Sequence, residues 1–260
     1  MNTLARLLLA MTLLTSTARA ELVTRIIEYR AGDAPLEGLL IQDSTGPALK
    51  PGVLVVHDWM GVGPYARMRA EQLARLGYVA FVADVYGKGV RPTSAAEAGA
   101  QAGKFKKDRP LLRARMLAAL AELRKQPGVL TGRVAAIGYC FGGTGALELA
   151  RAGADLSGVV SFHGGLDSPT PGDAKAIKAK VLVLHGADDP FVPPAEVQGF
   201  EQEMRGGGVD WTLVKYSGAV HAFTQEGAGH DNSKGAAYNA TADRRSWQAM
   251  RDFLDEVLRP

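Results

Sequence analysis

Five short runs of apolar residues, rich in β-branched side chains, alternate along the chain with stretches of helical character, and this alternation strongly limits the possible folds. The apolar runs occupy residues 52–57, 79–84, 134–139, 158–163 and 181–185. The helical stretches occupy residues 64–76, 111–125, 141–152, 194–204 and 244–258. Strands without polar alternation are typical of a parallel sheet that is buried on both faces. We therefore predict an α/β fold of three layers with a mostly parallel sheet.

Two earlier runs mix polar and apolar residues. They occupy residues 22–29 and 36–42, and Ala31-Gly32-Asp33-Ala34-Pro35 lies between them. This pattern predicts an antiparallel hairpin at the N-terminal end of the sheet. Because ligands of such sheets bind outside the carboxyl ends of the strands, we expect the catalytic side chains directly after the apolar runs.

The Ala- and Gly-rich segment 95–103, with Lys104-Phe105-Lys106-Lys107 after it, allows two interpretations. Its composition favours a solvated connector. A surface helix or a mobile flap over the site is the alternative.

The first twenty residues have the pattern of a secretory signal. Arg6 precedes an apolar run at 7–14, and the small residues Ala18 and Ala20 fit a cleavage site after Ala20. The run is too short to span a bilayer, which takes roughly 20 residues, so we expect no membrane anchor. We predict a periplasmic or secreted protein, with residues 21–260 forming a single domain.

The charge of the chain argues against a nucleic-acid partner. Removal of residues 1–20 takes away Arg6 and Arg19, so Lys+Arg falls from 30 to 28 against 27 Asp+Glu, and the formal net charge falls from +3 to +1. A nearly neutral protein lacks the electrostatic footprint of nucleic-acid or membrane binding. The chain also has only one cysteine, which excludes an internal disulfide.

That cysteine lies in a motif typical of nucleophiles. The run 134–139 leads directly into Gly138-Tyr139-Cys140-Phe141-Gly142-Gly143, and a predicted helix follows. This is the G-x-S-x-G elbow with cysteine in the serine position, where a sharp turn needs glycine on both sides. The helix N-terminus also favours thiolate over thiol. A buried structural cysteine is the alternative, and the glycines favour the nucleophile.

The acid and the base of a triad follow in the order that elbow hydrolases use. His221 comes after the predicted strand 211–216, and Asp189 comes after the run 181–185 in the spacing Gly186-x-x-Asp189-x-x-Val192. Asp188 is the alternative acid, although it is better placed to bond the backbone of its own turn. We predict the triad Cys140–Asp189–His221, in which the aspartate orients and stabilises the imidazole.

The remaining histidines are weaker candidates. His57, His163 and His185 each end a predicted strand, where they would either line the pocket or form structural hydrogen bonds, and His230 lies in a Gly- and Asn-rich loop. The sequence has no H-x-x-x-H or C-x-x-C motif. We therefore predict no metal site.

An oxyanion hole needs two backbone N–H donors. The residue after the nucleophile, Phe141, is expected to give one of them. The loop after the first long parallel strand, His57-Asp58-Trp59-Met60-Gly61, is expected to give the other, and we select Trp59.

Five blocks of sequence together resemble the dienelactone hydrolase (carboxymethylenebutenolidase) family of the α/β-hydrolase superfamily. They are His57-Asp58-Trp59-Met60-Gly61, Ala83-Asp84-Val85-Tyr86, Gly138-Tyr139-Cys140-Phe141-Gly142-Gly143, Asp189-Pro190-Phe191-Val192-Pro193 and His221-Ala222-Phe223. The resemblance implies an α/β-hydrolase fold, the same triad, an enol-lactone or related ester as substrate, and no cofactor.

The resemblance also implies roles for residues around the pocket. Asp58 takes the place of an acidic residue that contacts the resting cysteine, with a shorter side chain. Lys88 and Gln225 take the places of arginines that bind a substrate carboxylate, although neither offers the bidentate fork of arginine. The full set of predicted substrate-binding residues is Asp58, Tyr86, Lys88, His163 and Phe223.

From these features we predict a cysteine-dependent hydrolase of an enol-lactone or related activated ester, acting through an acyl-enzyme on Cys140. Its partner is a small-molecule ester or lactone, and it is a monomer or a weak homo-oligomer. Two alternatives stay open. One is a general carboxylesterase or thioesterase, and the other is a non-hydrolytic ligand-binding or thiol redox-sensing protein of the same fold.

Overall fold

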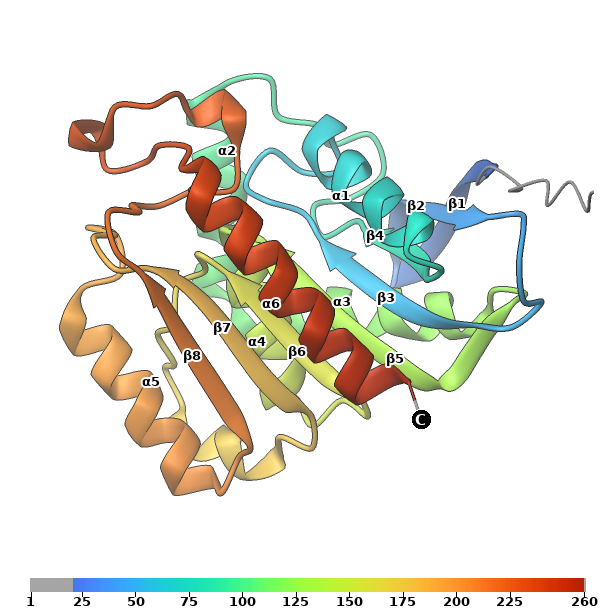
Figure 1. Ribbon diagram of the computed structural model, residues 1–260. Helices are drawn as coiled ribbons and strands as arrows, with labels where there is room; N and C mark the ends of the chain where they lie inside the picture. The colour runs from blue at the N-terminus through green and yellow to red at the C-terminus, as the bar shows by residue number, and fades with distance from the viewer. Residues whose placement is uncertain (1–20, 260) are drawn as a thin grey trace, which may run out of the picture.

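A computed structural model describes residues 21–259 of the chain, which form an eight-stranded sheet between two layers of helices (Figure 1). The spatial order of the strands is β1-β2-β4-β3-β5-β6-β7-β8. Their bounds are β1 Leu22–Ala31, β2 Ala34–Asp43, β3 Lys50–Val56, β4 Val79–Ala83, β5 Val129–Tyr139, β6 Gly158–Phe162, β7 Lys180–Gly186 and β8 Trp211–Tyr216. The predicted signal segment and its cleavage after Ala20 lie outside the described residues and stay predictions.

The sheet has the predicted mixture of strand directions. The hairpin strands β1 and β2 pair antiparallel, and β2 also pairs antiparallel with β4. All the other neighbouring strands pair parallel. Every residue of β4 and of β6 is buried, whereas the edge strand β1 is largely accessible to solvent. The α/β class, the mostly parallel sheet and the N-terminal hairpin are thus confirmed.

Six α-helices within residues 21–259 cover the two faces of the sheet. They are α1 Pro64–Arg75, α2 Ala95–Lys107, α3 Arg109–Lys125, α4 Phe141–Arg151, α5 Pro194–Gly207 and α6 Ala240–Leu258. Helices α1 and α6 pack on one face, and buried residues of α2, α3, α4 and α5 belong to the core on the other face. Figure 1 shows α6 in front of the sheet, with α3 and α4 behind it. Among the described residues, no helix combines the length and the apolar character that a membrane crossing requires.

The segment 95–107 is a helix, α2, and it contributes to the core. Ser94 caps its N-terminus by accepting a hydrogen bond from the amide of Glu97. Near its other end Phe105 is fully buried and stacks on Tyr86, with ring centroids 5.6 Å apart. The prediction of a solvated connector is therefore wrong: the segment is a helix, as the alternative had it, and Ala98, Ala102 and Phe105 are its buried residues.

Candidate active site

The predicted nucleophile elbow joins β5 to α4 in a backbone conformation that depends on its glycines. Cys140 has φ 54° and ψ −118°, outside the regions that L-residues ordinarily adopt. A Cβ atom at Gly138 would overlap the backbone of Gly142, and a Cβ at Gly142 would overlap the carbonyl of Val56. Only glycine fits at these two positions, and the tight turn places the half-buried Cys140 at the N-terminus of α4.

The carboxyl ends of β7 and β8 bring two more side chains to Cys140. His221 Nε2 lies 3.1 Å from Cys140 Sγ, and His221 Nδ1 lies 2.8 Å from Asp189 Oδ2. Asp189 is buried, and its Oδ1 accepts a hydrogen bond from the amide of Phe191 (2.8 Å). Asp188 is exposed and instead accepts from the amide of Gly218 (2.9 Å). Of the two candidate acids, Asp189 is therefore the one that contacts the imidazole.

The surroundings of His221 favour its protonated form. Burial by itself lowers the pKa of the imidazole, but the hydrogen bonds with Asp189 and Cys140 outweigh it and raise the pKa to about 10. A positive charge on this ring would lie directly beside the sulfur of Cys140, with the carboxylate of Asp189 on the other side of the ring.

The two backbone N–H groups predicted for the oxyanion hole belong to the residue after Cys140 and to a residue that lines the same cavity as Cys140. Phe141 is the first residue of α4, so its N–H group has no carbonyl of its own helix to bond. In the loop after β3, Asp58 Oδ1 accepts from the amide of Met60 (2.7 Å), and the hydroxyl of Tyr86 donates to the carbonyl of Trp59 (2.9 Å). These bonds fix the loop without using the N–H group of Trp59.

Cys140 opens into a cavity of about 640 Å³ whose lining is mostly apolar. Lys106 of α2 brings a positive charge to the wall, and the aromatic side chains of Trp59 and Phe191 are partly exposed at the same cavity. The lining residues are Trp59, Met60, Lys106, Cys140, Phe191, His221, Ala222, Gln225, Gly227, Ala228 and Ala236. The cavity has the size and the apolar character of a small-molecule site.

Several predicted pocket residues lie behind this wall. Asp58 is buried, and Gln225 of the wall donates its amide to Asp58 Oδ2 (2.8 Å); burial raises the pKa of this carboxyl. Tyr86 and Phe223 are buried and support the loops that carry Trp59 and His221. Lys88 is directed away from the cavity, because its Nζ pairs with Glu28 of β1 at 2.7 Å.

All three strand-end histidines are buried; His57 and His163 are hydrogen-bonded through both ring nitrogens, whereas the Nδ1 atom of His185 has no hydrogen-bond partner within residues 21–259. His57 Nδ1 lies 2.6 Å from the carbonyl of Asp58, and its Nε2 accepts from the amide of Val85 (3.3 Å). Burial lowers the pKa of His57 to about 4, so this ring is neutral. His163 is fully buried too, and it contacts the backbone of Cys140 rather than the cavity. Strand-end position alone could not separate these structural histidines from pocket residues.

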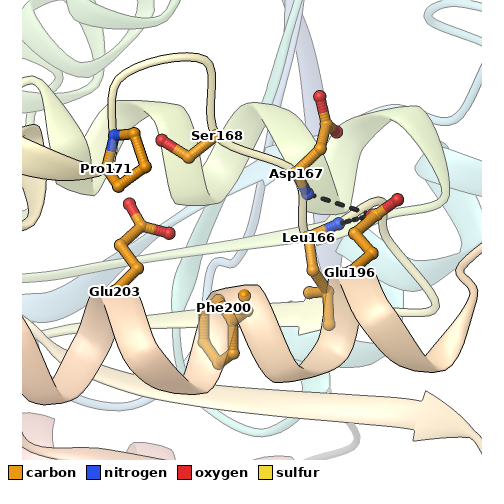
Figure 2. A pocket seen from close by; sticks show the side chains of 8 residues that line it. Leu166, Asp167, Ser168, Pro171, Glu196, Phe200 and Glu203 are labelled. Carbon is orange, nitrogen blue, oxygen red and sulfur yellow. Dashed lines mark hydrogen bonds between the residues drawn. The ribbon is translucent and has the colours of Figure 1, made fainter.

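A second cavity, of about 230 Å³, lies between α5 and the loop after β6 (Figure 2). Its carboxylates are already bonded. Glu196 Oε1 accepts from the amides of Leu166 (2.5 Å) and Asp167 (3.0 Å), as Figure 2 shows, and Glu203 pairs with Arg151 at 2.6 Å. Within residues 21–259, no group of three or more His, Cys, Asp or Glu side chains is placed to hold a metal ion. The cavity at Cys140 is therefore the better candidate for chemistry.

Sequence patterns did not identify Lys106 or Phe191 as pocket residues. The sequence could have identified Phe191 as a pocket residue, because it directly follows the Asp189-Pro190 pair of the predicted triad loop. Lys106 could not be identified in this way, because its position depends on how α2 packs against the rest of the molecule.

Known proteins resemble this chain over nearly its whole described length. The model of the dienelactone hydrolase family matches residues 36–258. A structure named m3DLH is 41% identical with a TM-score of 0.87, and the match covers 91% of this chain and 99% of that one. A dienelactone hydrolase-like promiscuous phosphotriesterase from metagenomic libraries is 39% identical with a TM-score of 0.86, over 92% and 99% of the two chains. A putative carboxymethylenebutenolidase of Synechocystis is 28% identical over 80% of this chain and 87% of its own.

Proposed function

Because the chain belongs to the dienelactone hydrolase family, and is therefore a carboxylic ester hydrolase of the α/β-hydrolase superfamily, we propose that it cleaves an enol-lactone or a related activated ester through an acyl-enzyme on Cys140. The observation that carries this proposal is the alignment of Cys140 Sγ, His221 and Asp189, with successive distances of 3.1 and 2.8 Å. Nucleophile, base and orienting acid are within hydrogen-bonding distance of one another, as covalent catalysis requires.

The proposed reaction has two steps. The Cys140 thiolate attacks the acyl carbon, and the N–H groups of Phe141 and Trp59 bind the oxyanion that forms. When the C–O bond breaks, His221 Nε2–H gives its proton to the leaving oxygen and a thioester remains. Water then loses a proton to His221 and attacks the thioester, and the C–S bond breaks to release the acid and restore the thiolate.

The thiolate explains the preference for activated esters. In the first tetrahedral intermediate the thiolate and the alcohol oxygen compete to leave, and thiolate is the better leaving group against an ordinary alkoxide. An enolate or aryloxide competes far better, so the intermediate goes forward to the thioester. A general carboxylesterase with a hydroxyl nucleophile, the alternative, would show a much weaker dependence on the leaving group.

Lys106 gives the cavity a preference for negatively charged substrates. The ion-paired lysines of the described chain are Lys88, Lys125 and Lys180, so the ammonium of Lys106 is available to a ligand. Its helix end is fixed on both sides, by the buried Phe105 and by Arg109, which pairs with Asp167 at 2.6 Å. Asp167 lies in the loop whose amides Glu196 binds (Figure 2). We therefore propose that an anionic substituent of the substrate lies against Lys106.

Two acetates and two hydrogen glutarates test this function in one experiment. Phenyl acetate, ethyl acetate, phenyl hydrogen glutarate and ethyl hydrogen glutarate combine a good or poor leaving group with a neutral or anionic acyl part. We expect higher kcat/KM for both phenyl esters. In Lys106→Gln, kcat/KM falls roughly ten-fold for the two hydrogen glutarates and stays unchanged for the two acetates, because a charged hydrogen bond is lost.

Lys107→Gln is the matched control, because Lys107 is exposed on the same helix and does not line the cavity. It should leave all four values unchanged. Equal losses on the neutral and the anionic phenyl ester would exclude charge recognition by Lys106, and equal kcat/KM for phenyl and ethyl esters would favour the general carboxylesterase.

A further inference from the structure

Three residues other than glycine have positive φ in the described chain, and all three lie close to the candidate active site. They are Cys140 (54°), His163 (39°) and Ala222 (56°). L-residues rarely adopt this conformation, and it persists where surrounding contacts hold it in place. Cys140 forms the elbow, Ala222 follows His221, and His163 directly follows β6. The contacts of His163 are therefore of interest.

The buried ring of His163 joins the elbow to the histidine loop. Its Nδ1 lies 3.2 Å from the amide nitrogen of Cys140, and its Nε2 lies 2.7 Å from Thr224 Oγ1. A backbone N–H group can only donate, so Nδ1 is the acceptor and Nε2 carries the proton that is donated to Thr224. Burial keeps the pKa of His163 well below its usual range, which preserves this neutral tautomer.

Thr224 is itself held firmly from the far side. The side chain of Thr224 is buried, and the hydroxyl of Tyr65 in α1 lies 2.6 Å from its Oγ1. Arg69 of the same helix donates to the carbonyl of Thr224 (2.9 Å) and also pairs with Asp243 of α6 at 2.6 Å. The end of the histidine loop is thus fixed to both helices on that face of the sheet.

The contacts of His163 with Cys140 and Thr224 form a bridge between the elbow and the histidine loop, and few other hydrogen bonds join these two segments. Among the described residues, the contact of Cys140 Sγ with His221 Nε2 is the one other hydrogen bond that joins residues 138–143 to residues 219–225. That contact must change in every catalytic cycle, because the sulfur becomes acylated. The His163–Thr224 bond does not involve the sulfur, so it can hold the two loops together while the sulfur is acylated. The ring of His163 also lies edge-on to that of His221, with ring centroids 5.3 Å apart.

We propose that His163 and Thr224 are positioning residues that hold the thiol of Cys140 and the imidazole of His221 at reacting distance; this inference rests on the proposed cysteine chemistry. Neither residue lines the cavity, so substrate binding should not depend on them. Catalysis should, because a small displacement of one reacting group relative to another slows the chemical steps strongly.

Thr224→Val tests the bridge, because valine keeps the shape of threonine and removes the hydroxyl that His163 contacts. We expect kcat for phenyl acetate to fall on the order of 10- to 100-fold, with KM nearly unchanged. Thr224→Ser keeps the hydroxyl and should restore most of kcat. A residue with a merely structural role would change the melting temperature and leave kcat of the folded enzyme alone.

His163→Asn provides a second test if Thr224→Val does not fold. Asparagine offers an acceptor near the position of Nδ1 but does not reach Thr224, so kcat should fall in the same way. Wild-type kcat in a folded Thr224→Val or His163→Asn protein would overturn the proposal. Cys140→Ala, measured beside them, separates the two ideas, because turnover that survives in Cys140→Ala would contradict the cysteine chemistry itself.

Discussion

Cys140→Ala is expected to lower kcat/KM for phenyl acetate roughly 10⁴- to 10⁶-fold, because the variant has no atom to accept the acyl group. The oxyanion donors and the cavity remain, so a small rate above the uncatalysed reaction should persist. The measurement is steady-state hydrolysis at neutral pH. A melting temperature close to that of the wild type would show that the elbow still folds, since alanine is no larger than cysteine.

Cys140→Ser is the informative companion. Serine restores a hydroxyl at the same place, beside His221, but an alcohol loses its proton far less readily than a thiol and is a weaker nucleophile in this position. We expect a residual activity far below that of the wild type. Near-wild-type turnover in the folded Cys140→Ala protein would mean that another residue performs the chemistry.

Asp189→Asn is expected to have the second largest effect, lowering kcat by roughly 10⁴-fold. The Asp189 carboxylate holds the proton of His221 on Nδ1 and is one of the groups that raise the pKa of the imidazole. An asparagine amide can donate to Nδ1 instead, which leaves the proton on Nε2, and His221 then cannot take the proton of the thiol. Steady-state kinetics on phenyl acetate measures the loss.

The neighbouring aspartate provides the control. Asp188→Asn removes a carboxylate that bonds the amide of Gly218 and does not contact His221, so its kcat should stay close to that of the wild type. The reverse ranking, with Asp188→Asn inactive and Asp189→Asn active, would assign the orienting role to Asp188. Similar losses in both variants would indicate a general effect of the loop on folding.

The sheet was predictable because burial on both faces leaves a clear mark on the sequence. Strand β4 consists of continuous apolar residues, and β6 does so except for the buried Ser161; such runs have few alternatives to a central parallel strand. The weakly patterned α2 was harder to predict. Its buried residues are Ala98, Ala102 and Phe105, and two of these are alanines, which give little contrast with the exposed positions of an Ala- and Gly-rich helix.

The parts of the site that follow local motifs were also predictable. The elbow around Cys140 and the loops that carry Asp189 and His221 each come directly after a strand, so the topology of the sheet brings them together. Lys106 and Lys88 show what local motifs miss. Lys106 reaches the cavity because Phe105 packs on Tyr86, and Lys88 is directed away because Glu28 of β1 binds it.

The role of His163 could not be predicted from local sequence either. A histidine at a strand end can line a pocket or bond the backbone, and the sequence holds no sign of which occurs. The choice depends on Thr224, which lies 61 residues away along the chain. Long-range pairs of this kind form only in the folded molecule, and they determine which of several chemically similar residues act in the site.

The most direct test of the proposed mechanism is to trap the acyl-enzyme. The wild type is mixed with excess phenyl hydrogen glutarate, quenched in acid within the first turnovers, and measured by intact mass and by peptide mapping. We expect one glutaryl group per chain, attached to the peptide that contains Cys140, and none in Cys140→Ala. Rapid turnover without any adduct on Cys140, or an adduct on a different residue, would contradict a thioester intermediate at this cysteine.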